Sequence, residues 1–344
     1  MSVAIGPVAW AQEMGSPGGA DPASDADRSG PSPNDDDLSV TVDVDAPEGL
    51  GTDTGFPSVP MTDGVSAESL LESTPVQGAG GATVAPRAST PAEVAAGILN
   101  TPLPPAAQQR RGRAAAGDPQ GDQGVVVVEL FTSQGCASCP PADMVMSELA
   151  QRRDILALAW HVDYWDYLGW KDEFALPENT DRQEGYALTA GERGVYTPQV
   201  IVDGQDTLMH MRPTDLMGMI AKNATRQPAV GIRIAQQGGQ QVVDLSPRTA
   251  VPGGVAVMLI RYAPERTVTI KAGENRGRQM TYANVVLGTE LIQRWPAKRA
   301  LRLRISPRAG ATGGFPSDTR HALIAQQILP PPRVGPILNA VPLD

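Results

Sequence analysis

The sequence contains few of the cysteine and histidine side chains on which zinc sites depend. Its 344 residues include two cysteines, three histidines and 4% aromatic residues. Structural zinc requires four ligands, and the small supply of histidine (His161, His210 and His321) disfavours it. No apolar run approaches the 18 residues of a transmembrane helix, so we expect no integral membrane segment.

The chain also lacks an excess of basic charge. Its net charge is −10 at pH 7, and the acidity is concentrated in residues 1–120, which hold 16 acidic residues against 5 arginines. The remainder is close to neutral, with 22 acidic and 23 basic residues. Because no basic face is indicated, we expect no binding to nucleic acid.

Residues 1–120 are rich in proline, glycine, serine and aspartate. Such a stretch cannot bury enough apolar surface to offset its chain entropy, so we predict a disordered acidic leader, with a tether as its simplest role. Within it, residues 1–11 carry a short apolar run and the pattern Ala9-Trp10-Ala11, typical of the end of a secretory signal peptide, but no basic region precedes them. A truncated signal peptide would predict a periplasmic or secreted protein, where disulfides persist.

Both cysteines lie in the stretch 129–143, which reads Glu-Leu-Phe-Thr-Ser-Gln-Gly-Cys-Ala-Ser-Cys-Pro-Pro-Ala-Asp. An apolar run at 125–131 predicts a buried strand before it, and two prolines at 140 and 141 predict the first turn of a helix after it. We expect Cys136 to lie at the helix N-terminus, where the macrodipole favours a thiolate, and to be the nucleophile nearer solvent. Cys139 would be the resolving cysteine; a structural disulfide or two reduced cysteines are the alternatives.

The remaining pattern predicts an α/β fold class with two domains. After the first strand and helix come a strand at 155–162, a helix to about 190, a short strand and hairpin near 199–204, and a helix at 213–226. From residue 229 onwards, short alternating runs predict an antiparallel β-sandwich-like domain. We place the first domain at 124–227, the sandwich at 228–329 and a tail at 330–344.

Four motifs together carry a resemblance to known proteins. They are the cysteine stretch, His-Val-Asp-Tyr-Trp at 161–165, Val-Tyr-Thr-Pro-Gln at 195–199 and Gly-Glu-Asn-Arg-Gly-Arg at 273–278. The element order and the Thr197-Pro198 pair resemble the thioredoxin fold, and the four motifs resemble the domain-of-unknown-function family 1223 of secreted bacterial proteins. The resemblance covers residues 124–329. It implies a thioredoxin-like first domain in which a cis Pro198 faces the cysteines and the Thr197 backbone pairs with substrate.

Other residues near the motif are candidates for the site. Glu129, a carboxylate inside an apolar strand, resembles the buried acid of thioredoxins and would accept the proton of Cys139; a salt-bridge partner is the alternative. His161 and Asp163 close a strand at the edge of the sheet that usually carries the site, although a lone histidine is more often a packing residue. Trp165 belongs to an aromatic segment that either packs as a subdomain or offers an apolar surface beside the cysteines. The arginines of 273–278 either bind an anion or lie in a solvated turn.

These residues predict thiol–disulfide exchange with protein or small-molecule thiols in the cell envelope, by a possible thiol–disulfide oxidoreductase without a cofactor or resident metal. Ala137 and Ser138 replace the Gly-Pro pair of thioredoxins, so the direction of electron flow is not predicted. One alternative is a Cu(I)-binding module using both thiolates with His161 or Met144. The other is a non-catalytic interaction protein with a structural disulfide.

Overall fold

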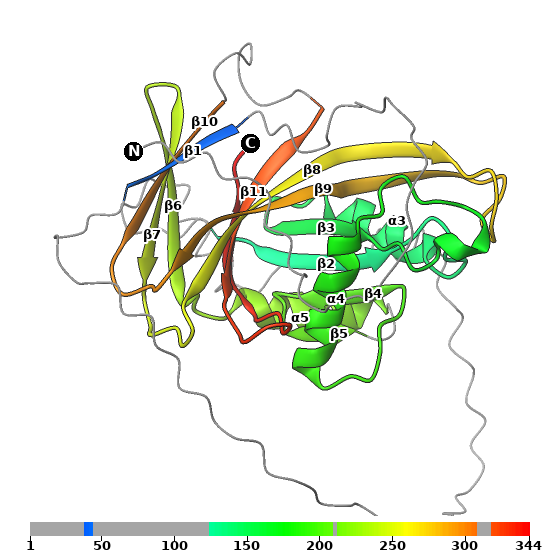
Figure 1. Ribbon diagram of the computed structural model, residues 1–344, viewed down its shortest axis with the longest axis horizontal. Helices are drawn as coiled ribbons and strands as arrows, with labels where there is room; N and C mark the ends of the chain where they lie inside the picture. Colours follow the sequence, from blue (N-terminus) through cyan, green and yellow to red (C-terminus); the bar gives the residue numbers. More distant parts are fainter. Residues whose placement is uncertain (1–37, 44–123, 209–211, 308–317) are drawn as a thin grey trace, which may run out of the picture. The chain divides into compact units, whose positions relative to one another are not determined.

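The computed structural model describes residues 38–43, 124–208, 212–307 and 318–344 (Figure 1). These residues form a mixed α/β fold in which strands predominate. In chain order the elements are β1 (Leu38–Asp43), β2 (Val126–Thr132), α3 (Pro140–Leu149), β3 (Ile155–His161), η1 (Asp166–Leu168), α4 (Pro177–Ala190), β4 (Gln199–Val202), β5 (Asp206–Leu208), α5 (Pro213–Ala224), β6 (Val230–Gln237), β7 (Gln240–Pro247), β8 (Val255–Thr269), β9 (Gln279–Trp295), β10 (Leu301–Pro307), β11 (Arg320–Gln327) and β12 (Ile337–Pro342).

The larger sheet has eight strands in the order β12-β11-β8-β9-β3-β2-β4-β5. Strand β2 pairs in parallel with β3 and antiparallel with β4, and β3 pairs in parallel with β9 where Ala159 meets Val285. The long β8–β9 hairpin therefore lies beside β3, which separates it in the sheet from β2, the strand that leads to the cysteines (Figure 1). Strands from both sides of the expected boundary at 227 and 228 belong to this one sheet.

Strands β2 and β3 are buried along their whole length, as their apolar sequences predict. Because side chains alternate between the faces of a strand, Val126, Val128 and Leu130 pack against α3 and α5 on one face. Val127 and Phe131 pack on the other face, in a cluster that includes Tyr186 of α4 and side chains of β8 and β11. The cysteine-bearing helix thus has a hydrophobic face on which to rest.

The second sheet contains four strands in the order β1-β10-β7-β6. Its inner side chains, including Ile232, Val243 and Leu303, form a third cluster with side chains of β8, β9 and β11. The predicted antiparallel strands of this region are confirmed, but they are not all short, since β8 is a single strand of 15 residues.

Two expectations about the chain ends are wrong in part. Strand β1 lies inside the stretch predicted to be disordered; it pairs with β10, and Val40 and Val42 pack against the third cluster. The remaining residues of that stretch, including 1–11, lie outside the described residues. The segment assigned to a tail contains β12, which pairs with β11 because Ile337, Ala340 and Val341 are apolar enough to be buried.

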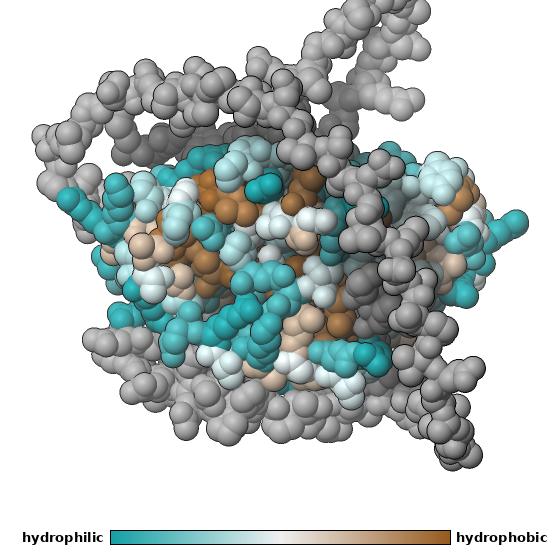
Figure 2. All heavy atoms as spheres, turned by 90° about the horizontal axis from the view of Figure 1, so that it is seen from below, coloured by the Kyte–Doolittle hydropathy of each residue, from teal (hydrophilic) through white to brown (hydrophobic). Residues whose placement is uncertain are grey.

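Large apolar side chains are exposed at three places in the described part of the chain: Met144 of α3, Tyr167 of η1 and Leu188 of α4. On the face shown in Figure 2, hydrophobic residues lie in several separate areas between hydrophilic ones. No helix among the described residues is long and apolar enough to cross a membrane.

Candidate functional site at the disulfide

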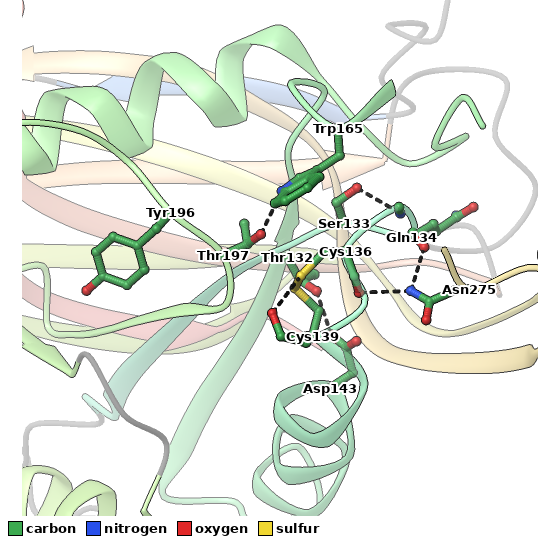
Figure 3. The surroundings of a disulfide bond; sticks show 12 residues. Thr132, Ser133, Gln134, Cys136, Cys139, Asp143, Trp165, Tyr196, Thr197 and Asn275 are labelled. Atoms are coloured by element: carbon green, nitrogen blue, oxygen red, sulfur yellow. Dashed lines mark hydrogen bonds between the residues drawn. A yellow bond between two sulfur atoms is a disulfide. The ribbon is translucent and has the colours of Figure 1, made fainter. Parts of the chain in front are cut away.

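Cys136 and Cys139 are joined by a disulfide bond, with their Cα atoms 5.5 Å apart (Figure 3). Only 1% of Cys136 and 0% of Cys139 is exposed, whereas Ala137 and Ser138 between them are exposed. The exposed fractions do not decide whether Cys136 is nearer solvent, because both cysteines are almost completely buried in this oxidised form. The loop turns inward at both cysteines, so solvent reaches only the two residues at its tip.

The cysteines lie before α3 rather than within it. Cys139 is the N-cap residue, and its carbonyl oxygen accepts hydrogen bonds from the N–H groups of Ala142 (2.8 Å) and Asp143 (3.1 Å). Cys136, which we expected at the helix N-terminus, lies in the preceding turn; its carbonyl oxygen accepts from the N–H of Cys139 at 3.3 Å. The prediction is off by three residues because the helix begins only at the first of the two prolines. The Sγ atom of Cys136 lies 3.4 Å from Oγ of Ser138.

A buried carboxyl group lies in the first turn of α3. Asp143 accepts a hydrogen bond at Oδ1 from the hydroxyl of Thr132 at 2.8 Å, while its Oδ2 is buried and has no hydrogen-bond partner among the described residues. Burial raises the pKa of Asp143 to about 7, although the charge of His161 and the hydrogen bond from Thr132 act in the opposite direction. A carboxyl with this pKa exchanges a proton readily near neutral pH. Sequence analysis missed it, although it stands four residues after Cys139.

His161 and Asp172 form a fully buried pair, with Nδ1 and Oδ2 2.7 Å apart. The same Oδ2 accepts the backbone N–H of Gln134 at 2.8 Å, which ties the pair to the cysteine loop. The His161 ring packs edge-on against Tyr282 of β9, with centroids 4.7 Å apart, and its Nε2 has no partner in the described part of the chain. His161 thus supports the loop from inside, and it is not exposed to a substrate.

Glu129 lies on the other face of β2. Its alternation with Val128 and Leu130 directs it away from α3, and it pairs with Arg182 of α4 at 2.8 Å and accepts from the hydroxyl of Tyr186 at 2.7 Å. The carboxyl that shares the α3 face with the cysteines is that of Asp143. The salt-bridge alternative therefore describes the structural setting of Glu129.

Two further predicted residues, Trp165 and Thr197, contact each other near the disulfide. The Thr197-Pro198 bond is cis, as predicted, and Nε1 of Trp165 donates to Oγ1 of Thr197 at 2.7 Å. Figure 3 shows Trp165 and Thr197 on one side of the disulfide and Asp143 on the other. Asp163 accepts a hydrogen bond from the hydroxyl of Thr180 of α4 at 2.7 Å.

The turn between β8 and β9 contributes a residue that sequence analysis missed. The side-chain amide of Asn275 donates to the carbonyl oxygens of Gln134 (2.9 Å) and Cys136 (2.8 Å). The neighbouring Arg276 and Arg278, which drew attention in the sequence, are exposed. The sequence shows the motif at 273–278, but the role of Asn275 within it is recognised only from the contacts of its side chain in the structure.

The described residues contain no group of three or more histidine, cysteine, aspartate or glutamate side chains arranged to hold a metal ion. Of the side chains expected to bind Cu(I), His161 is directed to Asp172 and Met144 is about half exposed on α3. The geometry does not favour the Cu(I) alternative.

Comparisons with known proteins identify a family without supplying an activity. The model of the family described as "Protein of unknown function (DUF1223)" matches residues 127–325. A crystal structure of an Agrobacterium tumefaciens protein is 31% identical, with a TM-score of 0.52, covering 64% of this chain and 94% of that one. HBP35 of Porphyromonas gingivalis is 13% identical, with a TM-score of 0.45, covering 64% of this chain and 75% of that one. No curated protein matches the chain.

Proposed function

Because this chain belongs to the DUF1223 family, whose description assigns no function, we propose an activity from the site itself: thiol–disulfide exchange through Cys136 and Cys139. The observation that carries this proposal is the position of the disulfide at the N-cap of α3, with a buried carboxyl of raised pKa in the first helical turn. Catalytic dithiols commonly occupy such helix N-termini, where the thiolate is stabilised.

The arrangement of β2, α3, β3, β4, β5 and α5 supports a thioredoxin-like assignment for this region, with the second sheet packed as a β-sandwich-like addition. Pro198 follows Thr197 through a cis peptide bond, as in the thioredoxin fold that this part of the sequence resembles. In this assignment the Thr197 backbone would pair with an extended substrate, while Trp165 would contact it beside the disulfide.

The proposed reaction has two steps. A substrate thiolate attacks Sγ of Cys136, so that a substrate–Cys136 bond forms, the Cys136–Cys139 bond breaks and Cys139 leaves as a thiolate. Asp143 in its protonated form then gives its proton to the Cys139 thiolate. A second substrate thiolate attacks the substrate sulfur, which releases a substrate disulfide and Cys136 as a thiolate. In the reverse direction Cys136 is the nucleophile, and Cys139 resolves the mixed disulfide while Asp143 accepts its proton.

Cys136 is the exchanging cysteine in this mechanism because its sulfur lies beside the exposed Ser138. Cys139 is fully buried and contacts the helix start. We place the protein in the cell envelope or outside the cell, since a disulfide persists in an oxidising compartment. Protein thiols or small-molecule thiols are the proposed partners.

Equilibration with glutathione redox buffers, followed by alkylation and mass measurement, tests the proposal. We expect the disulfide to be reduced within the range covered by exchange proteins, roughly −120 to −270 mV. Cys139→Ser should accumulate a mixed disulfide with glutathione at Cys136, and Cys136→Ser should accumulate far less.

A structural disulfide is the second candidate, because both cysteines are almost completely buried. In that case the bond would resist reduction down to potentials below about −300 mV unless the protein unfolds. Such resistance, with no mixed disulfide in Cys139→Ser, would replace the exchange proposal with the structural one.

A further inference from the structure

The cysteine loop is held by a residue from a distant part of the chain. Asn275 lies 139 positions after Cys136, in the turn that joins β8 to β9, and it is buried. Its single side-chain nitrogen donates to two carbonyl oxygens of the loop, those of Gln134 and Cys136. Both hydrogens of that amide are thus used to fix the backbone on which Cys136 is carried.

The turn that presents Asn275 has a defined backbone. Gly273 and Gly277 adopt positive φ angles of 72° and 82°, which glycine tolerates without steric cost. Ile270 donates to the carbonyl oxygen of Arg278 at 2.9 Å and accepts from the N–H of Gly277 at 2.8 Å. Asn275 is therefore presented from a hydrogen-bonded turn.

A second residue links the same turn to the loop. Gly273 lies next to Trp170, since a Cβ atom added to this glycine would lie 3.4 Å from Cβ of Trp170. The indole N–H of Trp170 donates to Oε1 of the buried Gln134 at 2.7 Å. Gln134 is consequently held through its backbone by Asn275 and through its side chain by Trp170.

We propose that Asn275 is a positioning residue of the disulfide loop, and that the β8–β9 hairpin thereby sets the reduction equilibrium of Cys136 and Cys139. Reduction replaces a covalent bond between the sulfurs with a non-bonded contact, so the loop carrying them relaxes. The two hydrogen bonds from Asn275 fit the loop of the oxidised form and oppose that relaxation. They stabilise the disulfide more than the dithiol.

This inference rests on the proposed function for its biological use, but it is measured independently. In the assay, dithiothreitol transfers two electrons and two protons to the protein disulfide and becomes a cyclic disulfide. For Asn275→Ala we expect the equilibrium constant for this reduction to rise about tenfold, equivalent to about 30 mV for a two-electron couple. The exposed neighbour Arg276→Ala is the matched control and should leave the constant unchanged.

Thermal melting of both redox forms separates positioning from general support. Asn275→Ala should lower the melting temperature of the oxidised form more than that of the reduced form. If the Ala variant does not fold, Asn275→Ser, which keeps one donor at this site, should show a smaller shift in the same direction.

Equal losses in the two forms, with the equilibrium constant within threefold of the parent, would overturn the inference, and so would a shift toward the disulfide. If dithiothreitol reduces the parent but Cys139→Ser accumulates no mixed disulfide with glutathione, the proposed exchange fails, while the equilibrium constant of Asn275→Ala still decides the role of Asn275.

Discussion

The hydroxyl of Thr132 donates to Oδ1 of Asp143 at 2.8 Å, which links the last residue of β2 to the first turn of α3. Both residues are buried, and the loop with the disulfide connects them. The loop that carries the disulfide is therefore closed at its base by a hydrogen bond between the last residue of β2 and the first turn of α3. This closure holds a titratable carboxyl beside the cysteines.

Replacement of Asp143 by Asn should slow the proton-dependent step at Cys139. The isosteric amide keeps an acceptor for Thr132 but cannot exchange a proton, so we expect the rate of mixed-disulfide resolution near pH 7 to fall 10- to 100-fold. In stopped-flow measurements from pH 5 to 9 we expect the rate for the parent to change near pH 7, the pKa of Asp143, and the rate for Asp143→Asn to show no such inflection. A profile that keeps this inflection would assign the proton to another group.

The pH dependence of stability should report Asp143 and Asp203 together. Burial raises the pKa of each carboxyl from 3.8 to about 7. Between about pH 4 and 7 the folded state therefore binds more protons than the unfolded state, and the free energy of unfolding falls as the pH rises through this window. Urea unfolding should show a smaller fall in Asp143→Asn and in Asp203→Asn than in the parent. Asp318→Asn, at an exposed position, is the control and should keep the full slope.

The ion pair of Glu129 and Arg182 should matter for stability and not for exchange. The guanidinium also lies 4.7 Å from the centre of the Trp160 ring and donates to Tyr186. Removing one partner leaves a buried charge, so Glu129→Gln and Arg182→Met should each cost about 3–5 kcal/mol of unfolding free energy.

The double variant Glu129→Leu with Arg182→Met should recover part of that loss, because no unpaired charge remains. Exchange rates of a folded Glu129→Gln protein should follow the pH profile of the parent. A lost inflection near pH 7 in this variant, with Asp143→Asn unaffected, would restore Glu129 as the proton acceptor for Cys139.

The hydroxyl of Ser138 should help to stabilise the Cys136 thiolate after reduction. With its oxygen 3.4 Å from Sγ in the disulfide form, it is placed to donate to a thiolate. Ser138→Ala should raise the pKa of the Cys136 thiol by about 0.5–1 unit, as expected for one partly exposed hydrogen bond to a charged group. The rate of alkylation against pH measures it, with Ser147→Ala as the control on α3. An unchanged pKa would leave Ser138 without this role.

Trp165 should limit access to the disulfide. Its indole N–H donates a hydrogen bond to Thr197. Trp165 also lies close to Gly135, the residue before Cys136, since a Cβ atom added to this glycine would lie 3.1 Å from Cβ of Trp165. Trp165→Ala should therefore accelerate reduction by glutathione about 3- to 10-fold if access limits the rate. Thr197→Val, which removes the hydrogen-bond acceptor of the indole, should be reduced at a rate between those of the parent and Trp165→Ala. Tyr167→Ala, at a residue 78% exposed in the same segment, should have no effect. Equal rates in all four proteins would contradict the shielding role.

The local elements around the cysteines could be predicted because their signals are local. Apolar runs marked β2 and β3, the paired prolines marked the start of α3, and Asp203-Gly204 marked the turn into β5. The pairing of the cysteines and the isomer of Thr197-Pro198 were also expected from the motifs. Each of these features depends on residues that are neighbours in the sequence.

The site beyond the cysteines was harder to predict because it depends on distant contacts. Glu129 and Asp143 both carry carboxyl groups and both stand next to apolar residues in the sequence. The structure shows that Glu129 points to the face of the sheet that carries Arg182, whereas Asp143 lies near the disulfide. Asn275 gives no signal of its own, since a polar residue between glycines is typical of a solvated turn. Strand β12 was missed for a similar reason, because prolines precede its short apolar run.

The distance along the chain between Cys136 and Asn275 also orders events during synthesis. The 139 residues between the cysteine and its anchor take about 7–28 s to translate at roughly 5–20 residues per second. Both cysteines are thus made well before β9 exists to complete the edge of β3 or Asn275 to hold the loop. The newly synthesised thiols therefore lack the hydrogen bonds of Asn275. The β8–β9 hairpin can fix the loop only after the second half of the chain has been synthesised.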